Sequence, residues 1–554
     1  GAGTPITDMQ SGAAGFSGPE LARVLLKKRI LGIAYETVEG ADGSFPLLKP
    51  MSQIAGRLSI QIGAYFLQSQ HGGSGVLLGG IPGTMPGHVV VVGGGPGGYA
   101  AALYAAGAGL SVALVELDKV GGTCLHRGCV PAKEFLETAS VYRTVRDAPT
   151  FGVAAGDGSG PSVDFAVSQA RKQVVVDQLF TGLSGLLKGR GVDVFNGSGT
   201  LLDGHRVRVV GNDGTLHEVE GTDVILAAGS VPRTIPGFDI DGSVVLTSDE
   251  VLALSVLPER VAVIGGGAIG CEFASLLSDL GSSVTVLEAM PSILAGCDAD
   301  VVRVVGRSFR KRGIDVRTGT TIHGHEPGPD GGTVISHGDG ESLAVDAVVV
   351  SVGRRPRTEG LVSEGAGVAV DERGYVLTDE YQRTSAPGVW AVGDIVASSP
   401  QLAHVAFAEA IVAVRSILGE PAAPVDYGRV PWAIYCHPEV AFAGMTEAQA
   451  AEAGIDVVVK KDPFGGNSRA RILDETDGMV KVLAERLPDG TAGRILGVHM
   501  VGPWVTEQLG AGYLAVNWEA TPDEVAHFLQ PHPSLSEAFG ETVLALTGRG
   551  LHVG

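Results

Sequence analysis

The feature that most constrains this chain is a strand–turn–helix pattern that occurs twice, each time with a run of glycines at the turn. In the first copy an apolar run, His88–Val92, leads directly into Gly93–Gly98 and then into an alanine-rich segment. A second apolar run, Ser111–Val115, ends at Glu116. This order predicts two parallel strands joined by a helix, with glycines where the chain turns tightly and the helix packs on the strand. The glycines at the G-x-G-x-x-G positions are Gly93, Gly95 and Gly98.

The first copy has the parts that a dinucleotide site needs. A helix that begins at the glycine run offers unpaired N–H groups and the positive end of its dipole to a pyrophosphate. Glu116 lies about 20 residues beyond the glycines, where an acid meets the ribose of a dinucleotide. A glycine fingerprint alone is a weak signal, because ordinary turns also contain glycine. Since strand, helix and terminal acid accompany it here, we interpret this copy as a nucleotide site.

The same order of features returns at Val261–Ile264, a second glycine run, a helix and Val284–Leu287. Glu288 ends this copy; its carboxylate would accept hydrogen bonds from ribose hydroxyls but repel a 2′-phosphate, which favours NAD over NADP. The alternative is that Glu288 only faces solvent at the end of a strand. Two such sites in one chain suggest two dinucleotides with electrons passing between them. The glycines at the second set of fingerprint positions are Gly265, Gly267 and Gly270.

Two cysteines follow the first copy closely, within Gly121–Lys133. Cys124 and Cys129 have four residues between them, which places them about one helical turn apart on one face, close enough to bridge, if the segment begins a helix. Zinc is the rival interpretation, but paired zinc ligands normally come with a second Cys/His pair, and none accompanies this one. We interpret the remaining cysteines as structural residues; they are Cys271, Cys297 and Cys436.

Composition limits the classes of function. Of the 554 residues, 44% are hydrophobic and 18% are charged, so a sizeable core is available. The net charge of −21 argues against nucleic acid or an anionic membrane as the main partner. Five cysteines in so long a chain make no disulfide framework, and no signal peptide is evident, so we expect a reducing, cytoplasmic location. The most apolar stretch, His88–Val115, is broken by glycines and is not a membrane span.

The segment Gly121–Lys133 closely resembles the redox-active segment of the pyridine nucleotide-disulfide oxidoreductases. The resemblance runs from the first glycine fingerprint to the C-terminus in consistent order, which is more than four-fifths of the chain. Ala228–Ser230 is similar to the family's turn between its FAD and NAD domains, and Val352–Pro356 is similar to its return from the NAD domain. Val392–Asp394 resembles its second FAD motif, in which the aspartate bonds the flavin's ribityl chain.

Within that family the details resemble the dihydrolipoamide dehydrogenases. Ala268–Ser275 and the terminal Glu288 are similar to their NAD-using form, whereas glutathione reductases usually place basic residues to hold a 2′-phosphate. The C-terminus has no cysteine pair of the mercuric reductase kind. Pro533–Glu537 resembles the Pro-Thr-Leu-Ser-Glu run of the lipoamide enzymes. The sequence departs from the family at Gln530, where a further histidine is usual, and at Ala132, where serine is common.

The resemblance implies a dithiol–disulfide mechanism that uses FAD and NAD. Cys124 would be the thiol that exchanges with substrate, and Cys129 the charge-transfer thiol beside the flavin. His532 would take a proton from the substrate dithiol, and Glu537 would hold the imidazole by its other nitrogen. The alternative for His532 is an ordinary loop residue between prolines, which the glutamate five residues later argues against.

The resemblance also implies an ion pair near the reactive edge of the flavin, formed by Lys133 and Glu272. The alternative for Lys133 is a solvated charge on a helix, since lysine is usually exposed. Further cofactor contacts implied by the resemblance are at Gly122, Thr123, Lys133, Ala228, Gly229, Gly353 and Asp394.

The implied substrate is dihydrolipoamide, free or on a lipoyl domain of a 2-oxo acid dehydrogenase or glycine cleavage complex. In this family the catalytic histidine comes from the other subunit, so the resemblance implies a homodimer. We expect no nucleic-acid partner and no membrane partner. Two alternatives stay open: a related NAD(P)H-dependent reductase of another disulfide or of a metal, and a flavin-binding regulatory or scaffold protein. A hybrid amino-acid dehydrogenase is the least favoured alternative.

The expected fold is α/β, with two Rossmann-like dinucleotide-binding domains for FAD and NAD, a C-terminal α+β dimerisation domain and an N-terminal extension. From His88 onward, short runs rich in Val, Ile and Leu alternate with helical segments, which favours parallel, buried strands with helical crossovers. The expected parts are the extension 1–86, the first part of the FAD domain 87–233, the NAD domain 234–354, the second FAD part or central domain 355–427, and the interface domain 428–554.

Residues 1–86 do not share that resemblance. Ala34–Val38, Leu47–Gly56 and His71–Gly83 closely resemble alanine dehydrogenase just before its own nucleotide domain. The upstream part, which carries that enzyme's substrate-binding lysine and histidine, is absent, so we infer no amino-acid dehydrogenation. A long helix is expected over Pro50–Ser69, and we interpret its apolar stripe as core rather than as a docking surface.

Overall fold

The computed structural model of this protein describes Lys27 and residues 88–154, 160–328 and 331–552. By internal contacts the chain divides into the units Gly1–Met85 and Pro86–Gly554. Lys27 is helical and exposed, and the helix expected over Pro50–Ser69 lies outside the described residues. All elements named below belong to the second unit.

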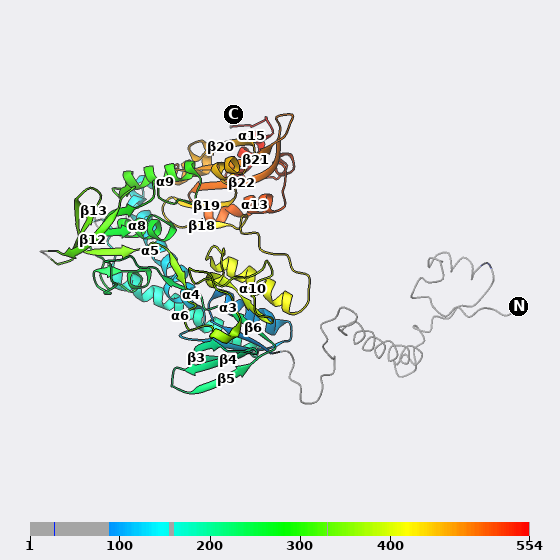
Figure 1. The fold of residues 1–554 in the computed structure, drawn as a ribbon. Coiled ribbons are helices and arrows are strands. Elements are labelled where there is room, and N and C mark those ends of the chain that lie inside the picture. The colour runs from blue at the N-terminus through cyan, green and yellow to red at the C-terminus, as the bar shows by residue number, and fades with distance from the viewer. Residues whose placement is uncertain (1–26, 28–87, 155–159, 329–330, 553–554) are drawn as a thin grey trace, which may run out of the picture. The chain divides into compact units, whose positions relative to one another are not determined.

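A seven-stranded sheet, of which Figure 1 labels β3, β4, β5 and β6, carries the first glycine run at the carboxyl end of an inner strand. Its order is β17-β6-β1-β2-β3-β4-β5. The pairs β17·β6, β6·β1, β1·β2 and β2·β3 are parallel, and β3, β4 and β5 continue as an antiparallel extension. The strands are β1 (His88–Val92), β2 (Ser111–Glu116), β3 (Asp193–Leu201), β4 (Arg206–Gly211), β5 (Leu216–Glu220), β6 (Asp223–Leu226) and β17 (Val389–Ala391).

Small residues allow helix α3 (Pro96–Gly107) to approach this sheet closely. Its alanines Ala101, Ala102 and Ala105 are buried, and they pack in one core with the valines of β1. Helix α10 (Ala403–Ile417) packs against α3, so two segments about 300 residues apart in sequence share a helical layer. The first glycine run and the Val392–Asp394 motif therefore follow two strands of the same sheet, β1 and β17.

A five-stranded parallel sheet repeats the arrangement around the second glycine run. Its order is β11-β10-β9-β15-β8, and helices α8 and α9 accompany it. A three-stranded antiparallel sheet, β12-β13-β14, adjoins it. The elements are β8 (Val245–Leu246), α7 (Ser248–Val251), β9 (Arg260–Ile264), α8 (Ala268–Asp279), β10 (Ser283–Glu288), α9 (Ala299–Lys311), β11 (Asp315–Thr318), β12 (Ile322–Pro327), β13 (Thr333–His337), β14 (Glu341–Val345) and β15 (Ala347–Val350). The expected duplication of a dinucleotide fold is confirmed.

A two-stranded ribbon links the seven-stranded sheet to the five-stranded sheet. Strand β7 (Ser230–Pro232) pairs antiparallel with β16 (Arg354–Pro356), so the chain enters and leaves the second sheet side by side. The short 3₁₀ helices that precede the C-terminal sheet are η3 (Ala148–Phe151), η4 (Glu364–Ala366) and η5 (Gly393–Ile395).

The C-terminal part is an antiparallel sheet with helices packed on it, as the expected α+β domain requires. The sheet order is β18-β19-β22-β21-β20, and α13 and α15 contribute buried apolar side chains to its core. The elements are β18 (Trp432–Ile434), β19 (Glu439–Gly444), α11 (Glu447–Glu452), β20 (Val457–Pro463), η6 (Phe464–Gly466), α12 (Ser468–Leu473), β21 (Met479–Arg486), β22 (Ala492–Gly502), α13 (Val505–Asn517), α14 (Pro522–Ala526) and α15 (Glu537–Leu546).

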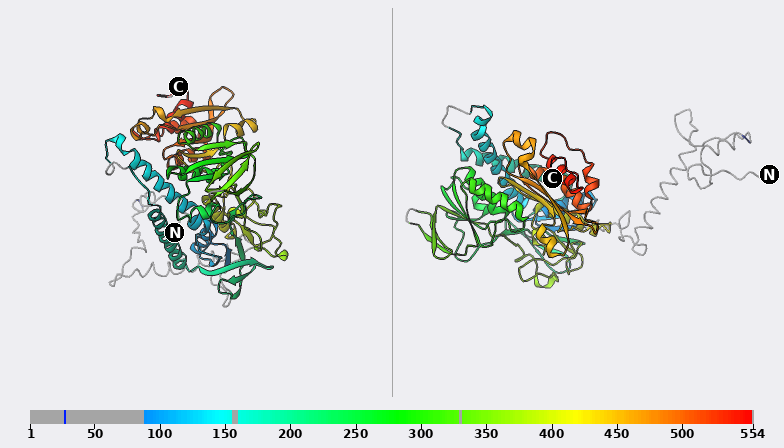
Figure 2. Two further views of the ribbon diagram at one scale, coloured as in Figure 1. Left: turned by 90° about the vertical axis from the view of Figure 1, so that its left-hand side faces the viewer. Right: turned by 90° about the horizontal axis from the view of Figure 1, so that it is seen from above.

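The cysteine segment forms two helices rather than one. Helix α4 (Gly122–Arg127) ends at Gly128, and α5 (Cys129–Asp147) begins at the second cysteine. The expectation that both cysteines lie on one face of a single helix is therefore wrong, because the backbone of Gly128, with φ −146° and ψ −115°, interrupts the helix. Helix α5 packs against α8 and against α6 (Phe165–Gly189), and α5 and α6 are the cyan-to-teal helices of Figure 2.

A buried ionic cluster joins the second parallel sheet to the C-terminal sheet. Lys481 on β21 is 1% exposed, and its Nζ lies 2.8 Å from both carboxylate oxygens of Asp298 and 2.8 Å from Asp300. Asp298 also caps α9 through the backbone N–H of Asp300. Because removing Lys481 would leave the buried Asp298 carboxylate without its cation, the cluster fixes these two parts against each other. None of the helices in the described ranges has both the length and the apolar character that a bilayer crossing requires.

Candidate active site

One cleft gathers most of the residues singled out in the sequence. It lies between the first glycine run, helices α4 and α5, the start of α8 and the turn that follows β17. The predicted residues that line it are Gly93, Gly95, Glu116, Gly122, Thr123, Cys124, Cys129, Lys133, Ala228, Gly229, Glu272 and Asp394. The second glycine run, Gly98, Gly353 and the His532–Glu537 pair lie outside its lining.

The first glycine run is shaped by close backbone contacts on one side and open space on the other. A Cβ on Gly98 would lie 1.7 Å from the carbonyl oxygen of Gly93, so only glycine lets α3 approach β1. A Cβ on Gly95 would meet only the Cα of Gly122, at 4.0 Å. The space beside Gly95 is therefore available to a pyrophosphate at the N-terminus of α3, and the residues fit a bound dinucleotide.

Glu116 holds this loop from the end of β2. The backbone N–H of Gly94 donates to Glu116 Oε2 at 2.6 Å, and that of Asp118 donates to Oε1 at 2.8 Å. The carboxylate is buried at the edge of the cleft. It stands where the ribose of a dinucleotide on the glycine run would present its hydroxyls.

The second glycine run reproduces this geometry in detail. A Cβ on Gly270 would lie 1.9 Å from the carbonyl oxygen of Gly265, whereas a Cβ on Gly267 would meet nothing within 4 Å. The backbone N–H of Gly266 donates to Glu288 Oε2 at 2.5 Å, and that of Met290 donates to Oε1 at 2.7 Å. Glu288 is therefore tied to the loop and does not merely face solvent, and this site also fits a dinucleotide with free ribose hydroxyls.

The two cysteines are free thiols and differ in acidity. A hydrogen bond with Cys124 and the Lys133 ammonium together lower the pKa of Cys129 to about 7, although burial opposes both effects. The same hydrogen bond, together with burial, raises the pKa of Cys124. Of the pair, Cys129 is thus the sulfur that carries negative charge at neutral pH.

Lys133 lies one helical turn after Cys129 on α5 and forms a two-pronged ion pair with Glu272 on α8. The Lys133 Nζ lies 2.9 Å from Glu272 Oε1 and 2.7 Å from Oε2. Burial lowers the pKa of Lys133, but Glu272 raises it on balance, so the ammonium stays protonated. Glu272 is only 8% exposed, which makes the pair a fixed feature of the cleft and not a solvated surface contact.

Asp394 follows β17 and turns its carboxylate towards the ribbon between the sheets. Ser230 Oγ donates to Asp394 Oδ2 at 2.5 Å, and Arg354 Nε donates to Ser230 Oγ at 2.7 Å. The aspartate therefore joins the first sheet, the β7–β16 ribbon and the cleft, and it is more than an ordinary turn residue. Gly353, just before β16, has φ +99° and allows the chain to turn into the ribbon.

The sequence did not reveal the buried glutamate behind Asp394. Glu409 on α10 is 0% exposed; its Oε2 accepts from the backbone N–H of Gly393 at 2.5 Å, and its Oε1 accepts from Tyr427 Oη at 2.7 Å. Burial raises the pKa of this carboxyl group. The available signal was a single acid inside an apolar helix, which is rare without a partner.

Tyr99 is a second residue that sequence reasoning missed. It follows Gly98 on the first turn of α3, and its ring centroid lies 5.6 Å from that of Phe407. Burial, together with the neighbouring Cys124 and Cys129, raises the pKa of Tyr99 to about 12. Its position directly after the fingerprint glycines was the only signal for its place beside the cysteines.

His532 and Glu537 form a pair of their own near the C-terminus. His532 Nδ1 donates to Glu537 Oε1 at 2.8 Å, and Glu537 Oε2 accepts from the backbone N–H of Ser534 at 2.7 Å. The imidazole is 73% exposed. The carboxylate thus orients the ring, as the sequence predicted, and this chain does not bring the pair into its own cleft.

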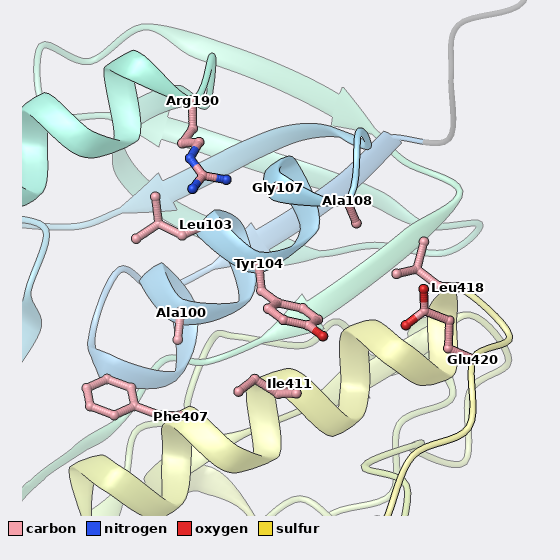
Figure 3. A pocket seen from close by; sticks show the side chains of 10 residues that line it. All are labelled: Ala100, Leu103, Tyr104, Gly107, Ala108, Arg190, Phe407, Ile411, Leu418 and Glu420. Atoms are coloured by element: carbon pink, nitrogen blue, oxygen red, sulfur yellow. The ribbon is translucent and has the colours of Figure 1, made fainter.

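A separate, shallow pocket lies between α3 and α10, on the side away from the glycine run. Figure 3 shows Tyr104 of α3 and Ile411 of α10 facing each other across it, with Arg190 above. None of the predicted site residues lines this pocket. Among the described residues, no cluster of three or more His, Cys, Asp or Glu side chains has the arrangement of a metal site.

The family described as pyridine nucleotide-disulphide oxidoreductase matches residues 87–410, and the dimerisation domain of the same family matches residues 430–543. This chain belongs to the pyridine nucleotide-disulphide oxidoreductases. Members of the family use FAD and NAD(H), and the geometry of the two glycine runs described above fits the two dinucleotides that this chemistry needs.

Relatives that are similar over most of this chain are named dihydrolipoyl dehydrogenase. The enzyme of Bacillus subtilis is 40% identical over 476 residues, which cover 84% of this chain and 98% of the relative. That of Haloferax volcanii is 38% identical over 469 residues, covering 84% and 97%. A crystal structure of LpdA from Mycobacterium tuberculosis superposes with a TM-score of 0.77 at 28% identity, covering 83% of this chain and 99% of that one.

Another oxidoreductase has a similar structure. RclA from Escherichia coli, an HOCl-induced flavoprotein disulfide reductase, superposes with a TM-score of 0.74 at 28% identity, over 83% of this chain and 100% of RclA.

Proposed function

We propose that this protein is a dihydrolipoyl dehydrogenase, which oxidises dihydrolipoamide to lipoamide with FAD as bound cofactor and NAD as electron acceptor. The observation that carries the proposal is the position of the cysteine pair. Cys124 and Cys129 line a cleft that also contains the first glycine run and the Lys133–Glu272 ion pair, directly beside the start of α8. Relatives that this chain matches over almost their whole length are named dihydrolipoyl dehydrogenase.

The proposed roles of the cysteines follow from their different acidity. In the oxidised enzyme the two sulfurs form a disulfide, and a substrate thiolate attacks Cys124 and releases Cys129 as a thiolate. The second substrate thiol then displaces Cys124, which leaves lipoamide with its disulfide and the enzyme with two thiols. Cys129 is the better leaving group because its pKa is lowered to about 7. FAD, when bound, supplies the two-electron chemistry that links these thiols to the nicotinamide.

The substrate thiol needs a base, and we assign this role to His532. Glu537 holds its Nδ1, so Nε2 is the nitrogen that takes the proton, and the carboxylate stabilises the imidazolium that results. Because the pair lies outside the cleft of its own chain, the proposal requires that His532 act in the cleft of a second copy.

A homodimer is supported by the C-terminal part of the chain. The family's dimerisation domain matches residues 430–543. This part exposes large apolar side chains, two of them within four residues of His532 in sequence: Leu529 is 90% exposed, Phe528 58% and Trp518 75%. Apolar side chains of this size are favourable to bury in a subunit interface. A second copy that packs against this C-terminal part would also receive the His532–Glu537 pair in its cleft.

The two cofactors are assigned to the same residues that the sequence predicts. We propose that FAD binds the first glycine run with Glu116, the cleft residues and Asp394. NAD binds the second glycine run, with Glu288 excluding a 2′-phosphate. The proposed division of the chain is the extension 1–86, FAD parts 87–233 and 355–427, the NAD domain 234–354 and the interface domain 428–554.

Substrate kinetics with purified holoenzyme test the proposal. We expect NAD reduction by dihydrolipoamide, lost in Cys124→Ser and strongly reduced in His532→Gln, with NADP a poor acceptor. No turnover of dihydrolipoamide, together with rapid NAD(P)H-dependent turnover of another disulfide or of a metal ion, would instead assign the chain to a sister reductase.

We further propose that the dithiol is presented on a lipoyl domain of a 2-oxo acid dehydrogenase or glycine cleavage complex, in the cytoplasm. Five cysteines in 554 residues are too few for a structural disulfide framework, which supports a reducing compartment. A lipoylated domain should be oxidised with a lower KM than free dihydrolipoamide, whereas equal KM values would speak against such a partner.

A further inference from the structure

The loop after β18 brings a tyrosine from the C-terminal part of the chain to the ion pair beside the cysteines. The backbone N–H of Tyr435 donates to Glu272 Oε1 at 2.9 Å. The Lys133 Nζ lies 4.8 Å from the centroid of the Tyr435 ring. Tyr435 therefore touches both partners of the pair, the carboxylate through its backbone and the ammonium through its side chain.

Three separate parts of the chain meet at this point. Lys133 comes from α5, Glu272 from α8 at the second glycine run, and Tyr435 from the loop between β18 and β19 of the C-terminal sheet. A lysine side chain has four rotatable bonds, and ordering it is entropically unfavourable. Glu272 fixes one side of the ammonium, and an aromatic face on another side restricts the remaining freedom, since cations are attracted to the π-face of tyrosine.

We propose that Tyr435 is a positioning residue that holds the Lys133 ammonium beside Cys129. The inference rests on the proposed function, because it concerns the thiolate of the reduced enzyme. Lys133 is one turn from Cys129 on the same helix, and its charge is one of the causes that stabilise the thiolate. If the ring is lost, the ammonium gains freedom to move away, and the thiolate loses part of that stabilisation.

Other charged groups near the site do not depend on the ring in this way. The titratable groups that face Cys129 are Cys124, Lys133, Glu272 and Tyr99. The carboxylates that face the Tyr435 hydroxyl are Glu439, Glu507 and Glu272. Replacing tyrosine by phenylalanine removes the hydroxyl and its response to these acids while keeping the π-face over Lys133. The two effects can therefore be separated by substitution.

The test is a pH titration of the long-wavelength thiolate–flavin absorbance in the anaerobic, two-electron-reduced holoenzyme. The variants are Tyr435→Leu, Tyr435→Met and Tyr435→Phe. Tyr381→Leu is a matched control, because Tyr381 also places its ring over a cation, Arg383, at 5.3 Å but outside α5, α8 and the Tyr435 loop. We expect the midpoint of this titration to rise by roughly half a pH unit to one pH unit in the leucine and methionine variants. Cys129 would then be a roughly threefold to tenfold weaker acid.

The phenylalanine variant and the Tyr381 control should titrate as the wild type does. An unchanged midpoint in Tyr435→Leu or Tyr435→Met, measured on protein that melts at the wild-type temperature, overturns the inference. So does an equal shift in Tyr435→Phe, because the ring would then not be the cause. The methionine variant supplies the test should the leucine variant fail to fold. Absence of the band from reduced wild type would instead overturn the proposed function, and the inference with it.

Discussion

The substitution Gly270→Ala should weaken binding at the NAD site without releasing FAD from the other dinucleotide site. The new Cβ would lie 1.9 Å from the carbonyl oxygen of Gly265 and 2.8 Å from Ser351 Oγ, whereas real Cβ contacts stay above 3.0 Å. The first of these neighbours is backbone, so it cannot rotate out of the way. Helix α8 must therefore move from the second glycine run by about 1 Å.

Such overpacking costs about 1–3 kcal/mol, because both elements are held by the surrounding core. The shift opens the loop on which the pyrophosphate of NAD would lie, so we expect an NADH affinity roughly fivefold to a hundredfold lower. FAD should stay bound, since the first glycine run belongs to another sheet and α8 contributes only one side of the cleft. Reduction of the bound flavin by dihydrolipoamide should also proceed, while its reoxidation by NAD slows.

Titration of NADH into FAD-loaded protein, together with thermal melting, measures this effect. Gly306→Ala is the matched control, because Gly306 lies within α9 and its Cβ would approach only Arg310 Nη1, at 3.9 Å. That variant should bind NADH normally and be as stable as wild type or up to about 1 kcal/mol more stable. Wild-type NADH affinity and melting temperature in Gly270→Ala would refute the steric argument.

Three further predictions concern the base, the cofactor loop and the thiolate. His532→Gln should lower kcat/KM for dihydrolipoamide about 10²- to 10⁴-fold without loss of FAD, and Glu537→Gln should have a smaller effect; stopped-flow reduction of the flavin measures both. Glu409→Ala leaves the Gly393 N–H buried and unpaired, which costs about 1–3 kcal/mol and should weaken FAD binding, measured by fluorescence of released FAD, whereas Glu409→Gln keeps an acceptor and should bind FAD nearly normally. Because the pKa of Cys129 is lowered to about 7, its thiolate should form as pH rises through that value, and a long-wavelength absorbance that does not change with pH would contradict this.

Much of the fold and site could be predicted because the decisive features are local. A buried strand, a glycine turn, a helix and a terminal acid follow one another within about 30 residues in each copy, and each step depends on backbone geometry that the residue types reveal. The contacts of Gly94 with Glu116 and of Gly266 with Glu288 are products of this local order.

The break between α4 and α5 was missed because helical spacing alone fits one continuous helix. Pro131 held the information: proline is tolerated in the first turn of a helix, and Cys129 is the first residue of α5. A helix that restarts just before the proline, with Gly128 as the break, was therefore available from the sequence.

The partners of the site that come from distant segments could not be predicted in the same way. The N–H of Tyr435 meets a carboxylate 163 residues earlier in the chain, and a backbone donor has no signature in the sequence. Glu409 likewise accepts from a backbone N–H. Such contacts exist only after the sheets have packed together, so they become visible only in the structure.

The most direct test of the central claim is anaerobic addition of dihydrolipoamide to the purified holoenzyme, followed by NAD. The account predicts that one equivalent of dithiol produces a long-wavelength thiolate–flavin absorbance, that NAD removes it as NADH forms, and that Cys129→Ser never shows it. A wild-type flavin that stays oxidised with dihydrolipoamide, or a band that persists in Cys129→Ser, would contradict the account.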